Sequence, residues 1–188
     1  GKQLRPRRVL VIGGGIAGCA VAGGLKTLGI EAIILDAAAQ EGAGASGNPA
    51  GIVVPFLTVG DTVGMRLSIS SLADTRAFLD AHDLIISNGV ISLDYDKRKS
   101  SRQKKIEEQG LPSDLATYKS ADELSATSGL PVKTGGLLFE TGAVIQPRQL
   151  SGQLAEGVER IYGAQLHAIS GEEGAWIAHC IDGRTFMA

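Results

Sequence analysis

The sequence is short of cysteine and has no long apolar run. Its two cysteines, Cys19 and Cys180, lack the spacing of a metal site or of a secreted disulfide framework, so we expect buried, reduced thiols in a cytoplasmic protein. No uninterrupted apolar stretch reaches the roughly 20 residues that a membrane helix needs. The basic opening and the apolar run after it are not a signal peptide, because glycines and Lys26 interrupt that run.

An excess of charge and an obvious catalytic pattern are also lacking. The formal net charge of −2 excludes bulk attraction to nucleic acid or an anionic membrane, so such a partner would need a local basic patch. The histidines, His82, His167 and His179, lie far apart in sequence and are each expected at the surface or in ordinary packing. No serine lies in a nucleophile-elbow motif, and no metal site is expected. We therefore expect a bound cofactor to carry any chemistry.

Hydrophobic residues make up 44% of the 188 residues, which predicts a globular protein of one or two domains. Glycine is abundant. An apolar run at residues 9–12 predicts a buried parallel strand, and Gly13, Gly15 and Gly18 then fit the pattern G-x-G-x-x-G. Gly13 allows a sharp turn, Gly15 allows a pyrophosphate to approach the backbone, and Gly18 allows the next helix to pack closely. That helix offers free N–H groups and the positive end of its dipole to a diphosphate.

A second apolar strand follows Gly29 and ends in Asp36. This carboxylate lies 18 residues beyond Gly18, near the distance at which an acidic side chain binds the ribose of adenosine. It disfavours NADP, whose extra phosphate it would repel, and leaves FAD and NAD open. A chance match among 26 glycines is the alternative, but the ordered strand, helix and carboxylate favour an adenine dinucleotide site over a packing turn.

Small residues without any periodicity occupy positions 37–51. One interpretation is a flexible loop. We favour a second turn in contact with the cofactor, because the segment directly follows the ribose-binding carboxylate and leads into an apolar run. In this turn Ser46 and Asn48 offer hydrogen bonds, and the glycines permit close approach.

Periodicity and capping signals predict the remaining elements. The expected helices are one capped by Asp61 that runs to about His82 with Met65, Ile69, Leu72 and Leu79 inward, a short one opened by a capping box at Ser120 and Glu123, and one from Pro147 to near Gly163 with Leu150, Leu154 and Ile161 inward. The expected strands are residues 89–95, a hairpin of 135–139 and 143–146 turning at Glu140-Thr141-Gly142, and residues 165–169 and 176–181 before a tight turn at 182–183.

Six basic residues crowd into the segment from Lys97 to Lys105. Such a run is commonly a solvated helix face, but here it is also the one patch of the sequence suited to engage phosphates. No aromatic residues interleave it, so base stacking is not indicated.

Four motifs follow one another in a characteristic order: residues 11–19, 44–51, 88–93, and 135–139 running on to 146–150. Together they resemble the D-amino-acid-oxidase-type superfamily of FAD-dependent oxidoreductases, and most closely the FAD-dependent C-terminal module of the bifunctional tRNA-modifying MnmC enzymes. The first motif is generic to dinucleotide-binding folds. The Gly-Ala-Ser-Gly-Asn loop behind the ribose carboxylate is more particular to this module.

The resemblance implies FAD as the cofactor and a secondary amine as the substrate, oxidised at its C–N bond. In the tRNA enzymes this reaction removes the carboxymethyl group of a carboxymethylaminomethyl wobble uridine, so tRNA is the implied partner, with the Lys97 to Lys105 segment as its expected contact. The implied FAD-binding residues are Gly13, Gly15, Ile16, Ala17 and Gly18 at the pyrophosphate, Asp36 at the ribose, and Ala45, Ser46, Asn48 and Gly51 along the inner part of FAD.

The implied fold class is α/β, an FAD/NAD(P)-binding Rossmann-like parallel sheet with an inserted mixed α+β portion of a substrate domain. We expect residues 1–87 to form the dinucleotide-binding part, 88–146 the insertion, and 147–188 a return to the first part. The family commonly has Glu in place of Asp36, whose shorter arm still reaches a ribose. Its modules are about twice as long, so we expect a chain truncated at its C-terminus that retains FAD weakly, is inactive alone and self-associates through unburied sheet edges.

Three other functions stay open at this point. A small-molecule oxidase or dehydrogenase of the same superfamily would act on glycine, sarcosine or a D-amino acid. A non-catalytic dinucleotide-binding module would bind without turnover. An NAD-linked dehydrogenase is disfavoured, because the loop behind Asp36 suits a flavin better.

Overall fold

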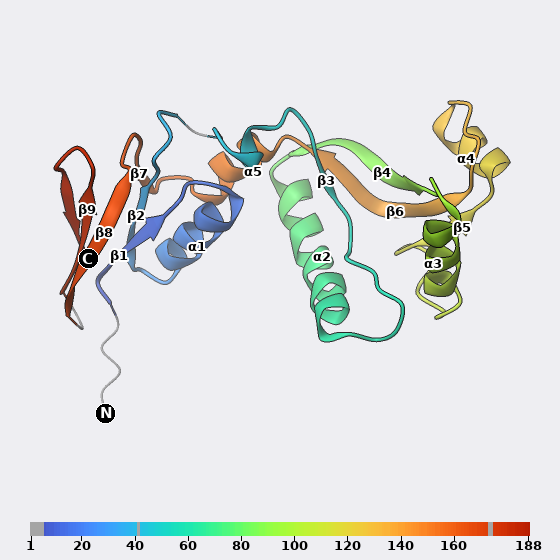
Figure 1. Ribbon diagram of the computed structural model, residues 1–188, viewed down its shortest axis with the longest axis horizontal. Coiled ribbons are helices and arrows are strands. Elements are labelled where there is room, and N and C mark those ends of the chain that lie inside the picture. The colour runs from blue at the N-terminus through green and yellow to red at the C-terminus, as the bar shows by residue number, and fades with distance from the viewer. Residues whose placement is uncertain (1–5, 41, 173–174) are drawn as a thin grey trace. The chain divides into compact units, whose positions relative to one another are not determined.

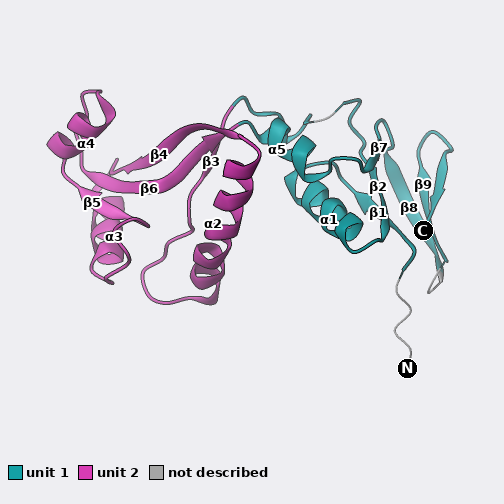
Figure 2. Cartoon of the chain, turned by 180° about the vertical axis from the view of Figure 1, so that it is seen from behind, with its two compact units in different colours: residues 1–49, 146–188 teal, residues 50–145 magenta. Residues whose placement is uncertain are grey.

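The computed structural model describes residues 6–40, 42–172 and 175–188. The chain forms two compact units, one made of residues 1–49 and 146–188 and the other of residues 50–145 (Figure 2). We call them unit 1 and unit 2 and describe each by itself.

Unit 1 is built on a parallel sheet of three strands in the order β1-β2-β7. Strand β1 (Arg8–Ile12) leads into helix α1 (Ile16–Thr27) and strand β2 (Glu31–Leu35), and helix α5 (Pro147–Leu154) leads into β7 (Glu159–Ile161) (Figure 1). Val9 pairs with Ala32, and Ile33 with Glu159. The predicted α/β class and parallel sheet are confirmed.

Both faces of this sheet are covered. Ala32 and Ile34 point to one face and pack with Cys19 and Ala22 of α1 and with Ala155. The residues that alternate with them, Ile33 and Leu35, pack on the other face against a second, antiparallel sheet through Ala164, Ala178 and Cys180. This two-sided burial explains why β2 is apolar without alternation.

The second sheet of unit 1 has the strand order β10-β9-β8. It contains β8 (Leu166–Glu172), β9 (Ala175–Cys180) and β10 (Thr185–Met187), and Gly183, with φ of +87°, lies in the turn between the last two. The predicted strands and tight turn are confirmed. Cys19 and Cys180 are both buried, as expected, and neither forms a disulfide within the described residues.

Unit 2 is a mixed α+β fold around one long strand, β6 (Gly136–Ile145). Strand β4 (Ile85–Leu93) pairs antiparallel with one side of β6, and the short strands β3 (Gly51–Val53) and β5 (Thr117–Lys119) pair with the other. The helices of unit 2 are α2 (Val63–Ala81), α3 (Lys97–Glu107) and α4 (Ala121–Ser128). Its core joins Met65 and Leu72 of α2 and Ile106 of α3 to Leu137 and Phe139 of β6.

The predicted hairpin at residues 135–146 is wrong. Residues 136–145 form one continuous strand, because β4 pairs along both of its halves. Val90 pairs with Phe139 while Asn88 pairs with Ala143, so Glu140-Thr141-Gly142 forms an irregularity inside β6 and not a turn.

Two helix predictions need correction at their ends. Helix α2 is capped by Thr62, whose hydroxyl accepts a hydrogen bond from the Met65 amide at 3.2 Å, and the predicted cap Asp61 instead pairs with Arg66 at 3.0 Å. Helix α5 ends at Leu154 and not near Gly163, since Gly157 has a φ of +67°. Two further strands also differ from their predictions: β4 begins earlier than expected, and Ile161 lies in β7.

The units also divide the chain earlier than the sequence suggested. Residues 50–87, which the sequence predicts to belong to the dinucleotide-binding part, contribute β3, α2 and the start of β4 to unit 2. The reason is packing, because α2 places Met65 and Leu72 in the core formed with β6. The return to unit 1 begins at residue 146.

Candidate functional site

The candidate site lies in unit 1, where β1 turns into α1. Gly13 has a φ of +103°, which favours glycine, and its amide donates to the carbonyl of Leu35 at 2.8 Å. A Cβ on Gly18 would collide with the carbonyl oxygen of Gly13, so the glycine lets α1 lie against the turn. Gly15 is the N-cap residue of α1 and, as a glycine, has no side chain that could cap the helix. The first amides of α1 therefore have no partner within the helix, as helix geometry requires.

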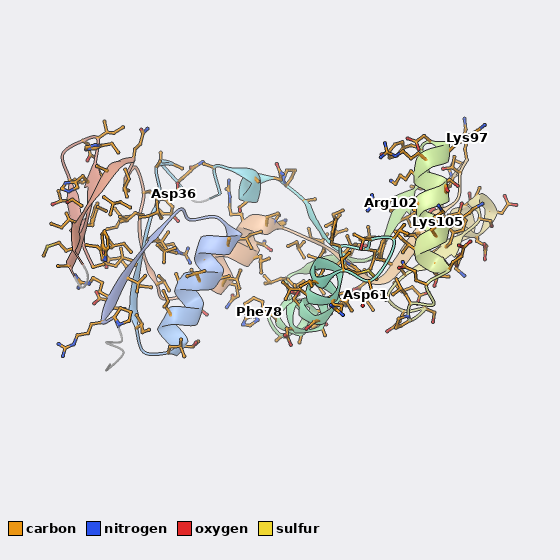
Figure 3. The ribbon with its side chains drawn as sticks, turned by 60° about the horizontal axis from the view of Figure 1, so that its bottom comes forward. Asp36, Asp61, Phe78, Lys97, Arg102 and Lys105 are labelled. Carbon is orange, nitrogen blue, oxygen red and sulfur yellow. The ribbon has the colours of Figure 1, made fainter. Side chains whose placement is uncertain are left out.

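Asp36 lies beside this turn (Figure 3). One carboxylate oxygen accepts a hydrogen bond from the Gly14 amide at 2.5 Å, and the other accepts from the Ala38 amide at 2.7 Å. The backbone of Asp36 is fixed as well, since its amide donates to Ile161 at 3.0 Å. Each carboxylate oxygen has a further lone pair, so Asp36 is held in place and can still accept from a hydroxyl.

Ser46 approaches the same helix end from a distant part of the chain. It lies in η1 (Ala45–Gly47), and its hydroxyl oxygen accepts a hydrogen bond from the Ile16 amide at 3.2 Å. Ser46 is buried. The short helix can fold back this closely because Gly47 has no Cβ, which would otherwise collide with the carbonyl of Gly42. The predicted second turn is thus brought to the N-terminus of α1.

The structure gathers most, but not all, of the predicted site residues at this point. Asn48 ends η1 and is exposed, and Gly51 begins β3 in unit 2, where it pairs with Ile145. The residues that meet around the N-terminus of α1 are Gly13, Gly15, Ile16, Ala17, Gly18, Asp36, Ala45 and Ser46.

Two residues of the site, Gly14 and Cys19, were not predicted from the sequence. Gly14, the variable position inside the glycine motif, supplies an amide to Asp36, and Cys19 directs its thiol to the Gly14 carbonyl at 3.4 Å. The position of Gly14 inside the glycine motif is the sequence signal that could have indicated its role. In the structure, a Cβ on Gly14 would lie 3.0 Å from the Asp36 carboxylate. The thiol contact carries no sequence signal.

The space in front of the turn suits an adenine dinucleotide. A Cβ on Gly13 or Gly44 would meet no atom within 4 Å, and one on Gly15 would meet only the Ser46 hydroxyl, at 3.4 Å. Backbone amides at a helix N-terminus bind a diphosphate, and a nearby carboxylate binds ribose hydroxyls. These residues fit the ADP part of FAD or NAD, and the Asp36 carboxylate opposes the extra phosphate of NADP.

The histidines lie elsewhere. His82 follows α2 and stacks on Phe78, with ring centroids 4.2 Å apart. His167 and His179, distant in sequence, come together on β8 and β9, and Ser170 lies within hydrogen-bond distance of His179, at 2.6 Å. Among the residues that the structure describes, no group of three or more His, Cys, Asp or Glu side chains could hold a metal ion. None of the described helices is long and apolar enough to cross a membrane.

The comparison with known proteins agrees with this geometry. The model of the family described as FAD dependent oxidoreductase matches residues 8–180. The tRNA 5-methylaminomethyl-2-thiouridine biosynthesis bifunctional protein MnmC of Burkholderia orbicola (strain MC0-3) is 36% identical over 163 residues, which cover 82% of this chain and 25% of that protein. The protein of the same name from Burkholderia multivorans is 32% identical over 190 residues, 95% of this chain and 29% of that protein.

A solved structure shows the same fold. The glycine oxidase of Geobacillus kaustophilus superposes with a TM-score of 0.76 at 18% identity, covering 97% of this chain and 54% of that one. The chain spans about a quarter of the length of the MnmC proteins that it matches. With the matched family model spanning nearly all of its residues, the chain belongs to the family of FAD-dependent oxidoreductases.

Proposed function

We propose that unit 1 holds the ADP part of FAD. The observation that carries this proposal is the meeting of three elements at one helix end: the glycine turn, the fixed carboxylate of Asp36 and the hydroxyl of Ser46. The amides of Gly15, Ala17 and Gly18 face the diphosphate, and Ile16, whose amide donates to Ser46, lies among them. Asp36 accepts from the ribose, and Ala45 and Asn48 follow the inner part of FAD.

We further propose that the full-length protein modifies tRNA. The names of the relatives support this step, because they describe biosynthesis of 5-methylaminomethyl-2-thiouridine in tRNA. The substrate is a wobble uridine that carries a carboxymethylaminomethyl group. FAD, when bound, supplies the acceptor for a hydride from the carbon between the amine and the carboxylate. Water then adds to the C=N bond, which breaks to give the aminomethyl nucleoside and glyoxylate.

A single-turnover experiment tests this function. The FAD-loaded full-length protein is mixed without oxygen with tRNA that carries the carboxymethylaminomethyl nucleoside. We expect one aminomethyl nucleoside and one glyoxylate for each FAD reduced, measured by mass spectrometry of the digested tRNA and by loss of flavin absorbance. Flavin reduction by glycine, sarcosine or a D-amino acid, with unchanged tRNA, would favour a small-molecule oxidase instead.

A matched pair of variants connects that reaction to the site. Gly15→Ala places a methyl group in the proposed diphosphate position, whereas Gly24→Ala adds one in open space on the exposed side of α1. We expect only the first variant to lose FAD and with it the reaction.

A further inference from the structure

Helix α3 carries six basic residues between Lys97 and Lys105, and the structure separates them into two sets. The inner set packs onto unit 2: Lys99 lies 4.5 Å from the ring centre of Tyr95, and Arg102 donates to the Leu57 carbonyl at 3.2 Å. The helix is anchored on this side by Gln103 and Ile106, both buried. The two inner cations are therefore committed to contacts within unit 2.

The other four residues form what we call the outer basic row: Lys97, Arg98, Lys104 and Lys105. All four are exposed, and three of them border a shallow hollow of the helix surface with Ser100 and Ser101 (Figure 3 labels Lys97 and Lys105). Residues 97 and 105 are about 12 Å apart along the helix at 1.5 Å per residue. This length is enough for the row to contact more than one phosphate of a nucleic-acid strand.

One acidic residue, Glu108, borders the same hollow as the row. Across the described ranges 6–40, 42–172 and 175–188, no residue of α3 takes part in an ion pair. Lys104 has one compensating contact, with the ring of Tyr118 at 5.4 Å. Lys97, Arg98 and Lys105 have no such contact in the part of the chain that the structure describes.

Two of the four residues lie where a cation is unfavourable without an anion, whereas Lys104 and Lys105 lie in the last turn, where the negative end of the helix dipole favours them. Lys97 and Arg98 lie in the first turn, where the helix dipole is positive, and that turn contains no acidic residue. Arg98 and Arg102 are also like charges four residues apart, which repel. The cap residue Asp96, which accepts from the Lys99 amide at 2.7 Å, offsets this only in part. An external polyanion would relieve each of these repulsions.

We infer that the outer basic row of α3 binds the phosphate backbone of the tRNA substrate. This inference rests on the proposed tRNA-modifying function and assigns the contact to particular residues. The row offers charge and the hydroxyls of Ser100 and Ser101, but no aromatic side chain of α3, so it contacts phosphates and not bases. It positions the substrate and has no part in the oxidation.

The test compares two double variants with equal net charge. Lys97→Gln/Lys105→Gln removes two outer cations, and Lys99→Gln/Lys133→Gln removes one inner cation and one exposed cation elsewhere in unit 2. Binding of bulk tRNA to the full-length protein is measured from 0.05 to 0.3 M salt. Each single-strand phosphate contact contributes roughly 0.7 to the slope of log K against log salt. The outer variant should lose about 1.4 of slope and bind about 25-fold more weakly at 0.1 M salt, while the control stays near the parent.

The outcomes separate the two proposals. If the outer variant binds tRNA like the control while the parent still converts the nucleoside, the inference about α3 is overturned and the proposed function stands. If the parent neither binds tRNA nor converts it, the proposed function itself fails. Equal losses in the two variants would also refute a role specific to the outer row, because they would reflect net charge alone.

Discussion

The substitution Gly15→Ala separates folding from cofactor binding. Gly15 has a φ of −76° and a ψ of 178°, a conformation that alanine adopts without strain. The added methyl carbon would lie 3.4 Å from the Ser46 hydroxyl, an ordinary van der Waals contact. The free energy of unfolding should therefore change by less than about 1 kcal/mol, and the change should be stabilising, because alanine restricts the unfolded chain.

Cofactor binding should respond differently. The methyl group occupies the space through which a diphosphate approaches the first amides of α1. Loss of one hydrogen bond to a charged group costs roughly 1.5–3 kcal/mol, which corresponds to a drop in affinity of about 10- to 150-fold. We expect a loss of this size for ADP, the simplest probe of the proposed site.

The assay combines calorimetric titration with ADP and urea unfolding of the same samples. Gly24→Ala is the control for binding, since its methyl group meets nothing within 4 Å and should raise stability by about 0.5–1 kcal/mol. Gly18→Ala is the control for folding, because its Cβ collides with the Gly13 carbonyl. Unchanged ADP affinity in a folded Gly15→Ala variant would refute our placement of the diphosphate.

Two further predictions concern unit 2. Tyr118→Phe removes the hydrogen bond that Tyr118 donates at 2.7 Å to the buried carboxylate of Asp94, and it should destabilise the protein by about 1–3 kcal/mol in urea unfolding. Tyr95→Phe, at a residue that is 79% exposed, should have no effect on stability, and equal stabilities of the two variants would contradict this role of Tyr118. Ser120→Ala should cost about 1 kcal/mol at pH 7 by breaking the capping box of α4. The backbone amide and hydroxyl of Ser120 lower the pKa of Glu123 below its ordinary 4.5, so this carboxylate stabilises the fold above that pH and ceases to do so as the pH falls through its lowered pKa. The backbone amide of residue 120 remains in the Ser120→Ala variant, so only the hydroxyl's share of this effect is lost. Thermal unfolding from pH 7 to 3 should show the difference between the variant and the parent narrowing below pH 4.5, and a constant difference would argue against the bond between the hydroxyl and the carboxylate.

The features predicted well are those whose cause lies in neighbouring residues. The apolar run of β1, the glycine turn and the small residues of α1 follow one another within 20 residues, so their pattern contains most of the forces that fold them. The capping box at Ser120 and Glu123 is likewise complete within four positions, and the structure confirms it together with the left-handed Gly129 that ends α4. Such signals need no knowledge of distant partners.

The failures occur where a distant partner overrides the local signal. Glu140-Thr141-Gly142 has the composition of a turn, but the pairing of β4 with both halves of β6 keeps the strand continuous. Ile161 lies at helical spacing from Leu154, yet it pairs with Leu35 in the parallel sheet. In each case long-range backbone hydrogen bonds outweigh a local preference of a few tenths of a kcal/mol to about 1 kcal/mol.

Ser46 illustrates how the site itself was only half predictable. The composition of its loop suggested contact with the cofactor, but only the close approach of Gly47 to Gly42 brings the hydroxyl to the Ile16 amide, 30 positions away in sequence. Because the Ser46 oxygen accepts from that amide, the hydroxyl hydrogen stays available as a donor. A donor beside amides that have no partner within the helix favours an anion, whereas an acceptor there would repel one. In the proposed site the loop would therefore add to the affinity of the helix end for a diphosphate, and the carboxylate of Asp36 would bind the ribose.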